Sequence, residues 1–171
     1  MPTETPPTDP TPTIALIGAT SIAERIASRA LRSGFNVVID DVSDARLKAI
    51  SLNLHGAGSS LNLTQSIESA IRSADFIIDA LPDDLEVKLE LFTLFDKFAK
   101  PTAIFITTGS IPIDDLAEIT FCPDRCLAVR LTASPDGNES VVQLMPGRKT
   151  SAQTLKTCTN LFLNSLAYRA A

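Results

Sequence analysis

Short apolar runs alternate with stretches of helical periodicity along almost the whole chain. The first run, residues 14–17, meets Gly18, and a helical pattern with Ile22 and Ile26 on one stripe begins four residues later. Further strands are predicted at residues 36–39, 61–63, 75–80, 103–107, 125–132 and 140–145. Helices are predicted at residues 44–54, 65–71, 85–99, 112–119 and 151–168. This alternation predicts an α/β chain of three layers with a mostly parallel, doubly wound sheet.

Residues 1–12 differ from the rest of the chain in composition. They hold five of the eleven prolines, with Thr, Glu and Asp between them. Such a segment is typical of a disordered or polyproline tail. The remaining residues, 13–171, are predicted to form a single Rossmann-like domain.

Charge and composition exclude several classes of protein. The net charge is −5 and no Lys/Arg cluster is present, so we expect no nucleic-acid partner. No apolar run approaches the ~20 residues that span a bilayer, and the N-terminus has no signal-peptide pattern. Three cysteines cannot all pair, which favours the reducing cytoplasm. His55 is the only histidine, so we expect no metal site.

The turn at Gly18 occupies the place of a dinucleotide phosphate loop, between a strand and a helix. Only the first glycine of G-x-G-x-x-G is present, because Thr20 and Ala23 stand at the other two places. Thr20 puts a β-branched side chain where the backbone should approach a pyrophosphate. Ser21 and Glu24 match a capping box, whose satisfied amides are those that a pyrophosphate would use. We therefore expect NAD to bind weakly or not at all.

A carboxylate also stands at the position that usually holds the adenosine ribose. Asp41 follows Gly18 by 23 residues, and a carboxylate there accepts hydrogen bonds from ribose hydroxyls, favouring NAD over NADP. The alternative is that Asp40 and Asp41 are simply two acidic residues that end a strand.

Several segments, in this order, resemble the NAD-binding domain of the 3-hydroxyacyl-CoA dehydrogenase family over residues 13–166. They are IALIGATSIAERIA, VVIDDVSD, ADFIIDALPDDLEVKLELF, TTGSIPIDDLAEIT, residues 125–131 and GRKTSAQTL. The resemblance implies that Asp83 stands where the family has a glutamate near the nicotinamide ribose. It likewise implies that Lys88 corresponds to a lysine in the same cleft. The alternative for Lys88 is a solvated helix lysine between Glu86 and Glu90.

The resemblance also implies that the family's catalytic groups are replaced. In the family a histidine oriented by a glutamate exchanges a proton with the 3-hydroxyl, and a serine helps to position the substrate. The match places Arg130 at the histidine, Gln143 near the glutamate, and Gly109 at the serine, with Ser110 next to it. Arginine stays charged near neutral pH and cannot act as a general base. For Arg130 itself, a structural ion pair is favoured over a cation that faces an anionic ligand.

Three hypotheses from different classes follow. The first is a pseudoenzyme, a dehydrogenase-like domain that acts as a binding or interaction module. The second is an NAD-dependent oxidoreductase with a different substrate, or one completed by a partner chain. The third is a structural role through a homodimer or a partner protein. It is motivated by the expectation that the chain stops before the family's last strands and helical C-terminal domain, leaving apolar surface exposed.

Overall fold

The computed structural model describes residues 11–58, 60–133 and 140–171. Most of the predicted tail, residues 1–10, lies outside these described residues. No helix in the described ranges combines the length and apolarity needed to cross a membrane.

Eight strands form one sheet in the order β3-β2-β1-β4-β5-β6-β7-β8. Neighbours from β3 to β6 are parallel, β6 and β7 are antiparallel, and β7 and β8 are parallel. The order 3-2-1-4-5-6 is that of the doubly wound dinucleotide fold, so the predicted fold class is confirmed. The strands are β1 (Thr13–Ile17), β2 (Asn36–Asp40), β3 (Leu61–Thr64), β4 (Phe76–Asp79), β5 (Ile104–Thr108), β6 (Cys126–Ala133), β7 (Ser140–Pro146) and β8 (Arg169–Ala170).

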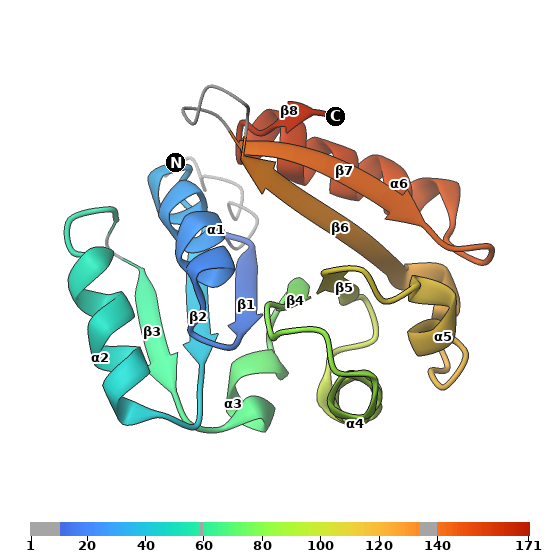
Figure 1. Cartoon of the computed structure of the whole chain (residues 1–171), viewed down its shortest axis with the longest axis horizontal. Helices are drawn as coiled ribbons and strands as arrows, with labels where there is room; N and C mark the ends of the chain where they lie inside the picture. The colour runs from blue at the N-terminus through green and yellow to red at the C-terminus, as the bar shows by residue number, and fades with distance from the viewer. Residues whose placement is uncertain (1–10, 59, 134–139) are drawn as a thin grey trace, which may run out of the picture.

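Helices cover both faces of the sheet (Figure 1). One core joins the sheet to α1, α2 and α6, and the other joins it to α3, α4 and α5. Each helix presents an apolar stripe to the sheet, as its sequence period requires. The helices are α1 (Ser21–Arg32), α2 (Asp44–Asn53), α3 (Ile67–Ile71), α4 (Leu85–Phe98), α5 (Ile113–Ala117) and α6 (Ala152–Thr159).

The C-terminal helix is shorter than predicted. After α6 the chain makes a π-helical turn, Asn160–Ser165, in which the Leu166 amide donates to the Leu161 carbonyl. Ala167 then adopts φ 54°, a left-handed conformation that ends the helix. The prediction of helix to residue 168 is therefore wrong, because the chain turns here to add β8 beside β7.

Helix α4 buries most of the apolar stripe that its periodicity predicts, since Leu91 and Phe95 are buried and Leu94 and Phe98 are half-buried; the prediction is wrong only at Val87. Val87 is 39% exposed, whereas Lys88 and Phe92 are fully buried. Lys88 reaches the sheet, where its ammonium pairs with Asp79.

Candidate cofactor-binding site

Polar and apolar side chains form a row along the carboxyl edge of the sheet. The strand register places Ile17 of β1 beside both Asp40 of β2 and Asp79 of β4, and Asp79 beside Thr107 of β5. Register-matched side chains share a face of the sheet, and Ile17 belongs to the core under α3 and α4. This row crosses the β1–β4 switch point, where doubly wound folds bind their ligands.

The Gly18 turn is built for close approach of neighbouring chain segments. Gly18 has φ 98°, and a Cβ at this position would lie 2.6 Å from a methyl carbon of Leu81. Only glycine fits both constraints. The β1–α1 connection is thereby held tightly against the end of β4.

Thr20, not Ser21, is the N-cap of α1. Its hydroxyl accepts from the Ala23 amide at 3.3 Å and donates to the Ala80 carbonyl at 2.9 Å. Ser21 is the first helical residue. The predicted capping box is therefore wrong, because the chain enters the helix one residue earlier.

Glu24, the second residue of the predicted capping box, bonds to α2 and not to the start of α1. The Glu24 carboxylate accepts a hydrogen bond from the Asn53 side chain of α2 at 3.0 Å. The Thr20 cap satisfies a single amide, while the amides of Ser21 and Ile22 have no acceptor within the helix. The helix start is thus only partly self-capped, and two amides stay available to an anion.

Asp41 lies directly beside this turn and is held by four hydrogen-bond donors. Its carboxylate accepts from the amides of Ala19 and Ser43, each at 2.8 Å. Arg46 adds a forked contact, with its Nη2 2.6 Å and its Nε 3.0 Å from the carboxylate. Burial opposes ionisation, but these hydrogen bonds and the Arg46 charge outweigh it and hold the pKa of Asp41 below its usual value.

The neighbouring Asp40 has no comparable set of partners. The residue is 4% exposed, and its Oδ1 has no hydrogen-bond partner in the described part of the chain. Burial and the Asp41 charge raise the pKa of Asp40 to about 6. From the sequence, Asp40 is predicted only to end a strand. The sequence did hold a sign of its position, because an acidic residue at the end of a buried parallel strand lies at the edge where doubly wound folds bind ligands.

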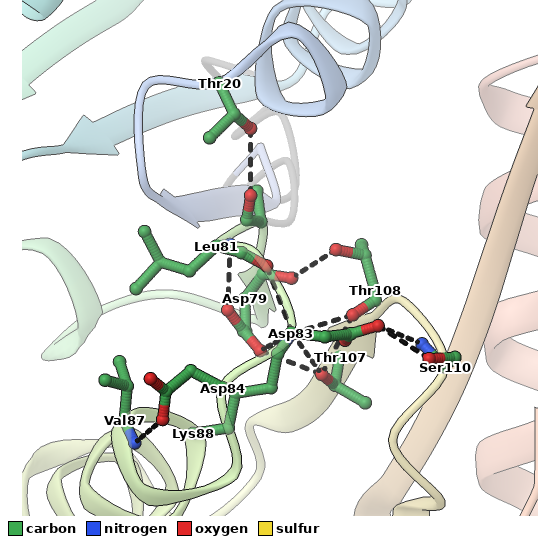
Figure 2. A network of polar contacts seen from close by, with 11 residues as sticks. Thr20, Asp79, Leu81, Asp83, Asp84, Val87, Lys88, Thr107, Thr108 and Ser110 are labelled. Atoms are coloured by element: carbon green, nitrogen blue, oxygen red, sulfur yellow. Dashed lines mark hydrogen bonds and ion pairs between the residues drawn. The ribbon is translucent and has the colours of Figure 1, made fainter.

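Lys88 is the centre of a second polar cluster, and it is completely buried (Figure 2). Its ammonium lies 2.7 Å from Asp79 Oδ2 and 2.7 Å from the Thr108 carbonyl. The Leu81 carbonyl and the Thr107 hydroxyl each lie at 3.2 Å. Four acceptors thus surround three ammonium protons. The interpretation of Lys88 as a solvated helix lysine is wrong.

Asp83 lies at the rim of this cluster and contacts the loop after β5 (Figure 2). Its Oδ2 accepts from the amide of Ser110 at 2.9 Å and from the hydroxyl at 2.7 Å. Burial of Asp83 is outweighed by these bonds and by Lys88, so its pKa lies below the usual value. Gly109 has φ 109°, and a Cβ there would lie 2.1 Å from Asp83 Oδ1. The Asp83 carboxylate thus occupies the space that a Gly109 side chain would need.

Arg130 and Gln143 face each other across the antiparallel β6–β7 pair. Both residues are exposed. Among the described residues Arg130 makes no ion pair. Asp136 and Glu139, which follow β6, lie outside these residues, so the favoured structural ion pair stays a prediction. The register nevertheless juxtaposes the two positions that the resemblance had assigned to an acid/base pair.

Comparison with known families agrees with this geometry. A model of the family described as 3-hydroxyacyl-CoA dehydrogenase, NAD binding domain, matches residues 48–165. The chain belongs to this family. Of the predicted cofactor residues, Asp83 and Lys88 lie within the matched range and Gly18, Thr20 and Asp41 precede it; their role in holding a cofactor stays a prediction.

Similar proteins include several dehydrogenases. A 5-formyl-3-hydroxy-2-methylpyridine 4-carboxylate 5-dehydrogenase from Mesorhizobium japonicum is 26% identical, over 86% of this chain and 53% of its own length. An L-carnitine dehydrogenase from Pseudomonas is 28% identical, over 88% of this chain and 51% of its own length. The structure of 3-hydroxybutyryl-CoA dehydrogenase from Escherichia coli K12 matches with a TM-score of 0.83 and 22% identity, over 94% of this chain and 38% of that one.

These matches concern one part of the relatives. The chain spans about half the length of the curated relatives it matches. The structural match, at its low identity, supports the doubly wound fold of this NAD-binding domain.

Proposed function

We propose that this chain is a nucleotide-binding module of the dehydrogenase type that binds NAD mainly through its adenosine half and does not catalyse hydride transfer. The single observation that carries the proposal is the arrangement at the nicotinamide end. There Asp83 bonds to Ser110 and fills the space beside Gly109. The position matched to the family's serine thus has neither a side chain nor room for one.

The proton-transfer positions support the same conclusion. Arg130 faces Gln143, and neither side chain can take up and release a proton near neutral pH. The other end of the edge offers groups for a nucleotide instead. The two open amides of α1 suit the pyrophosphate, and Asp41 with the apolar surroundings of Asp40 suits the adenosine. The proposal is therefore binding without the family's acid/base chemistry.

Calorimetric titration with NAD and with ADP-ribose tests the binding half of the proposal. We expect the two affinities to agree within a few fold, because the donors of Lys88 are already used within the protein. Asp41→Asn should weaken both ligands about tenfold, since it removes a charged acceptor for the ribose. Glu90→Gln, an equal charge change on the exposed side of α4, is the matched control and should have no effect.

An absorbance assay for NADH with 3-hydroxybutyryl-CoA tests the catalytic half. We expect no turnover by the wild-type chain. NADH formation by the wild type that disappears in Arg130→Ala would overturn the non-catalytic proposal. Binding of NAD far tighter than ADP-ribose would overturn the adenosine-dominated mode while leaving the absence of catalysis untouched.

A further inference from the structure

Two cysteines lie together at the edge of the sheet where the parallel strands begin. Cys122 and Cys126 flank a single 3-10 turn, Pro123–Arg125, and Cys126 is the first residue of β6. Both cysteines belong to the core that joins the sheet to α4 and α5. Because β6 runs parallel to β5, β4 and β1, its start lies at the opposite edge from the turns that follow those strands. The pair is therefore separate from the candidate cofactor site.

The 3-10 turn brings the two thiols side by side. The Arg125 amide donates to the Cys122 carbonyl at 2.9 Å, which closes the turn. The sulfur of Cys126 lies 3.5 Å from the same carbonyl oxygen. The two thiols are also within hydrogen-bonding reach of each other. A disulfide requires two neighbouring cysteines whose side chains point toward one another, and this turn provides such a pair.

The two thiols differ in exposure and in acidity. Cys122 is 5% exposed, whereas Cys126 is fully buried. The hydrogen bond from Cys126 and the charge of Arg125 outweigh burial and the Asp96 charge, and they lower the pKa of Cys122. The same hydrogen bond, together with burial, raises the pKa of Cys126. The thiolate is the reactive form of cysteine, so Cys122 is the thiol that an oxidant attacks first.

The chain around Cys122 gives a small oxidant a route to it. Phe121 is 97% exposed, and Asp124 is exposed as well. The Phe121 amide donates to Asp96 Oδ1 at 3.0 Å, and the Cys122 sulfur lies 3.8 Å from the same oxygen. Only Cys122 has to meet the oxidant, because Cys126 already lies beside it. Hydrogen peroxide is only slightly larger than water, so it suits this limited exposure.

The third cysteine provides an internal reference. Cys158 is fully buried in the core on the other face of the sheet. Burial raises the pKa of Cys158 to about 12. The sheet lies between Cys158 and the pair, so Cys158 can neither join them nor react as Cys122 does.

We propose that Cys122 and Cys126 are a redox modification site that forms a reversible disulfide, with hydrogen peroxide as the oxidant. The Cys122 thiolate attacks one peroxide oxygen, the O–O bond breaks, and hydroxide leaves with the thiol proton as water. Cys126 then gives up its proton and attacks the resulting sulfenic acid, so that the S–S bond forms, the S–O bond breaks and a second water leaves. Two thiols thus lose two electrons and two protons, and one peroxide becomes two waters.

The reverse step needs only a small thiol, which reduces the disulfide by exchange. In reducing compartments, disulfides of this kind are usually transient and act as redox sensors. The inference goes beyond the proposed nucleotide binding and does not depend on it.

Peptide mapping of the full-length wild type tests the proposal directly. The folded chain is treated with hydrogen peroxide, its remaining thiols are alkylated, and it is digested with trypsin without reductant. Trypsin cleaves after Arg125, between the two cysteines. We expect the peptide Cys126–Arg130 to be linked to the peptide that ends at Arg125, about 2 Da below the sum of the two reduced peptides. Dithiothreitol should release the link, and Cys158 should be found alkylated.

Single variants assign the two steps. Cys126→Ser should stop at the sulfenic acid, which dimedone traps on Cys122. Cys122→Ser should slow the oxidation of Cys126 about tenfold or more, because the more acidic thiol is gone. Cys158→Ser is the matched control and should form the same link as the wild type. Circular dichroism identifies any variant that fails to fold, and the wild-type peptide map stays decisive in that case.

Three results would overturn the proposal. One is a folded wild type that keeps all three thiols under peroxide while the urea-unfolded chain loses them. Another is oxidation of Cys122 to the sulfinic acid with no link to Cys126. The third is a link between two chains, seen as a doubled mass on a non-reducing gel, in place of the link within one chain.

Discussion

Replacing Lys88 by methionine should destabilise the protein more than any exposed substitution. Methionine keeps the apolar stem of the side chain but removes the ammonium that lies 2.7 Å from Asp79. Asp79 would keep the Thr107 hydroxyl and the Leu81 amide as donors but would have no cation. Removing one partner of a buried ion pair costs about 3–5 kcal/mol. For a domain of this size that corresponds to a fall in Tm of roughly 6–20 °C.

Urea unfolding followed by circular dichroism measures this cost. Lys97→Met makes the same change at an exposed position of α4 and should cost less than about 0.5 kcal/mol. The double variant Asp79→Leu/Lys88→Met should recover most of the loss, because apolar replacement of a whole buried pair is often neutral. A loss below about 1 kcal/mol in Lys88→Met would refute the structural role of the pair.

Three further substitutions probe the same edge. Gly109→Ala should lower the free energy of unfolding by about 1–3 kcal/mol, because φ is positive and its Cβ would meet Asp83. The loss is measured as a lower urea midpoint, and an unchanged midpoint would contradict this packing. Asp40→Asn should remove a fall in stability, on the order of 2 kcal/mol, that the wild type shows as pH rises from about 4 to about 6. The sign follows because the folded carboxyl holds its proton above the unfolded value of 3.8, so ionisation opposes folding; equal pH profiles would exclude it. Thr20→Gly removes a β-branched side chain from the phosphate turn and should tighten NAD binding in calorimetry, whereas unchanged affinity would show that Thr20 is no obstacle.

Most of the fold could be predicted from local patterns. Strands β1, β2, β4, β5 and β6 each contain a short apolar run. Gly18 marks the first turn because its conformation and the nearby Leu81 favour glycine. The end of the last helix could not be predicted, since Leu155, Cys158, Phe162 and Leu166 keep a helical spacing. It depends on the pairing of β8 with β7, a contact between segments that sequence periodicity does not encode.

The site was predictable in position but not in its contacts. The spacing from Gly18 predicted the position of Asp41, but no pattern in the neighbouring sequence predicted its contact with Arg46. Lys88 lies between two glutamates on its helix, a pattern typical of a solvated surface. Its burial depends on Asp79, nine residues earlier on another element. Charged residues take their role from partners across the sheet, and single-segment patterns do not report these partners.

The two ends of the cofactor edge differ in how completely the protein satisfies its own polar groups. At the nicotinamide end, Asp83 bonds to Ser110 and all protons of Lys88 have acceptors. At the other end Asp41 is also fully satisfied, by four donors, and Oδ1 of Asp40 alone lacks a partner in the described chain. A buried acceptor without a partner carries a cost that a hydrogen-bond donor removes. Asp40 is therefore the residue of this edge at which a new hydrogen-bond donor would raise the stability of the fold.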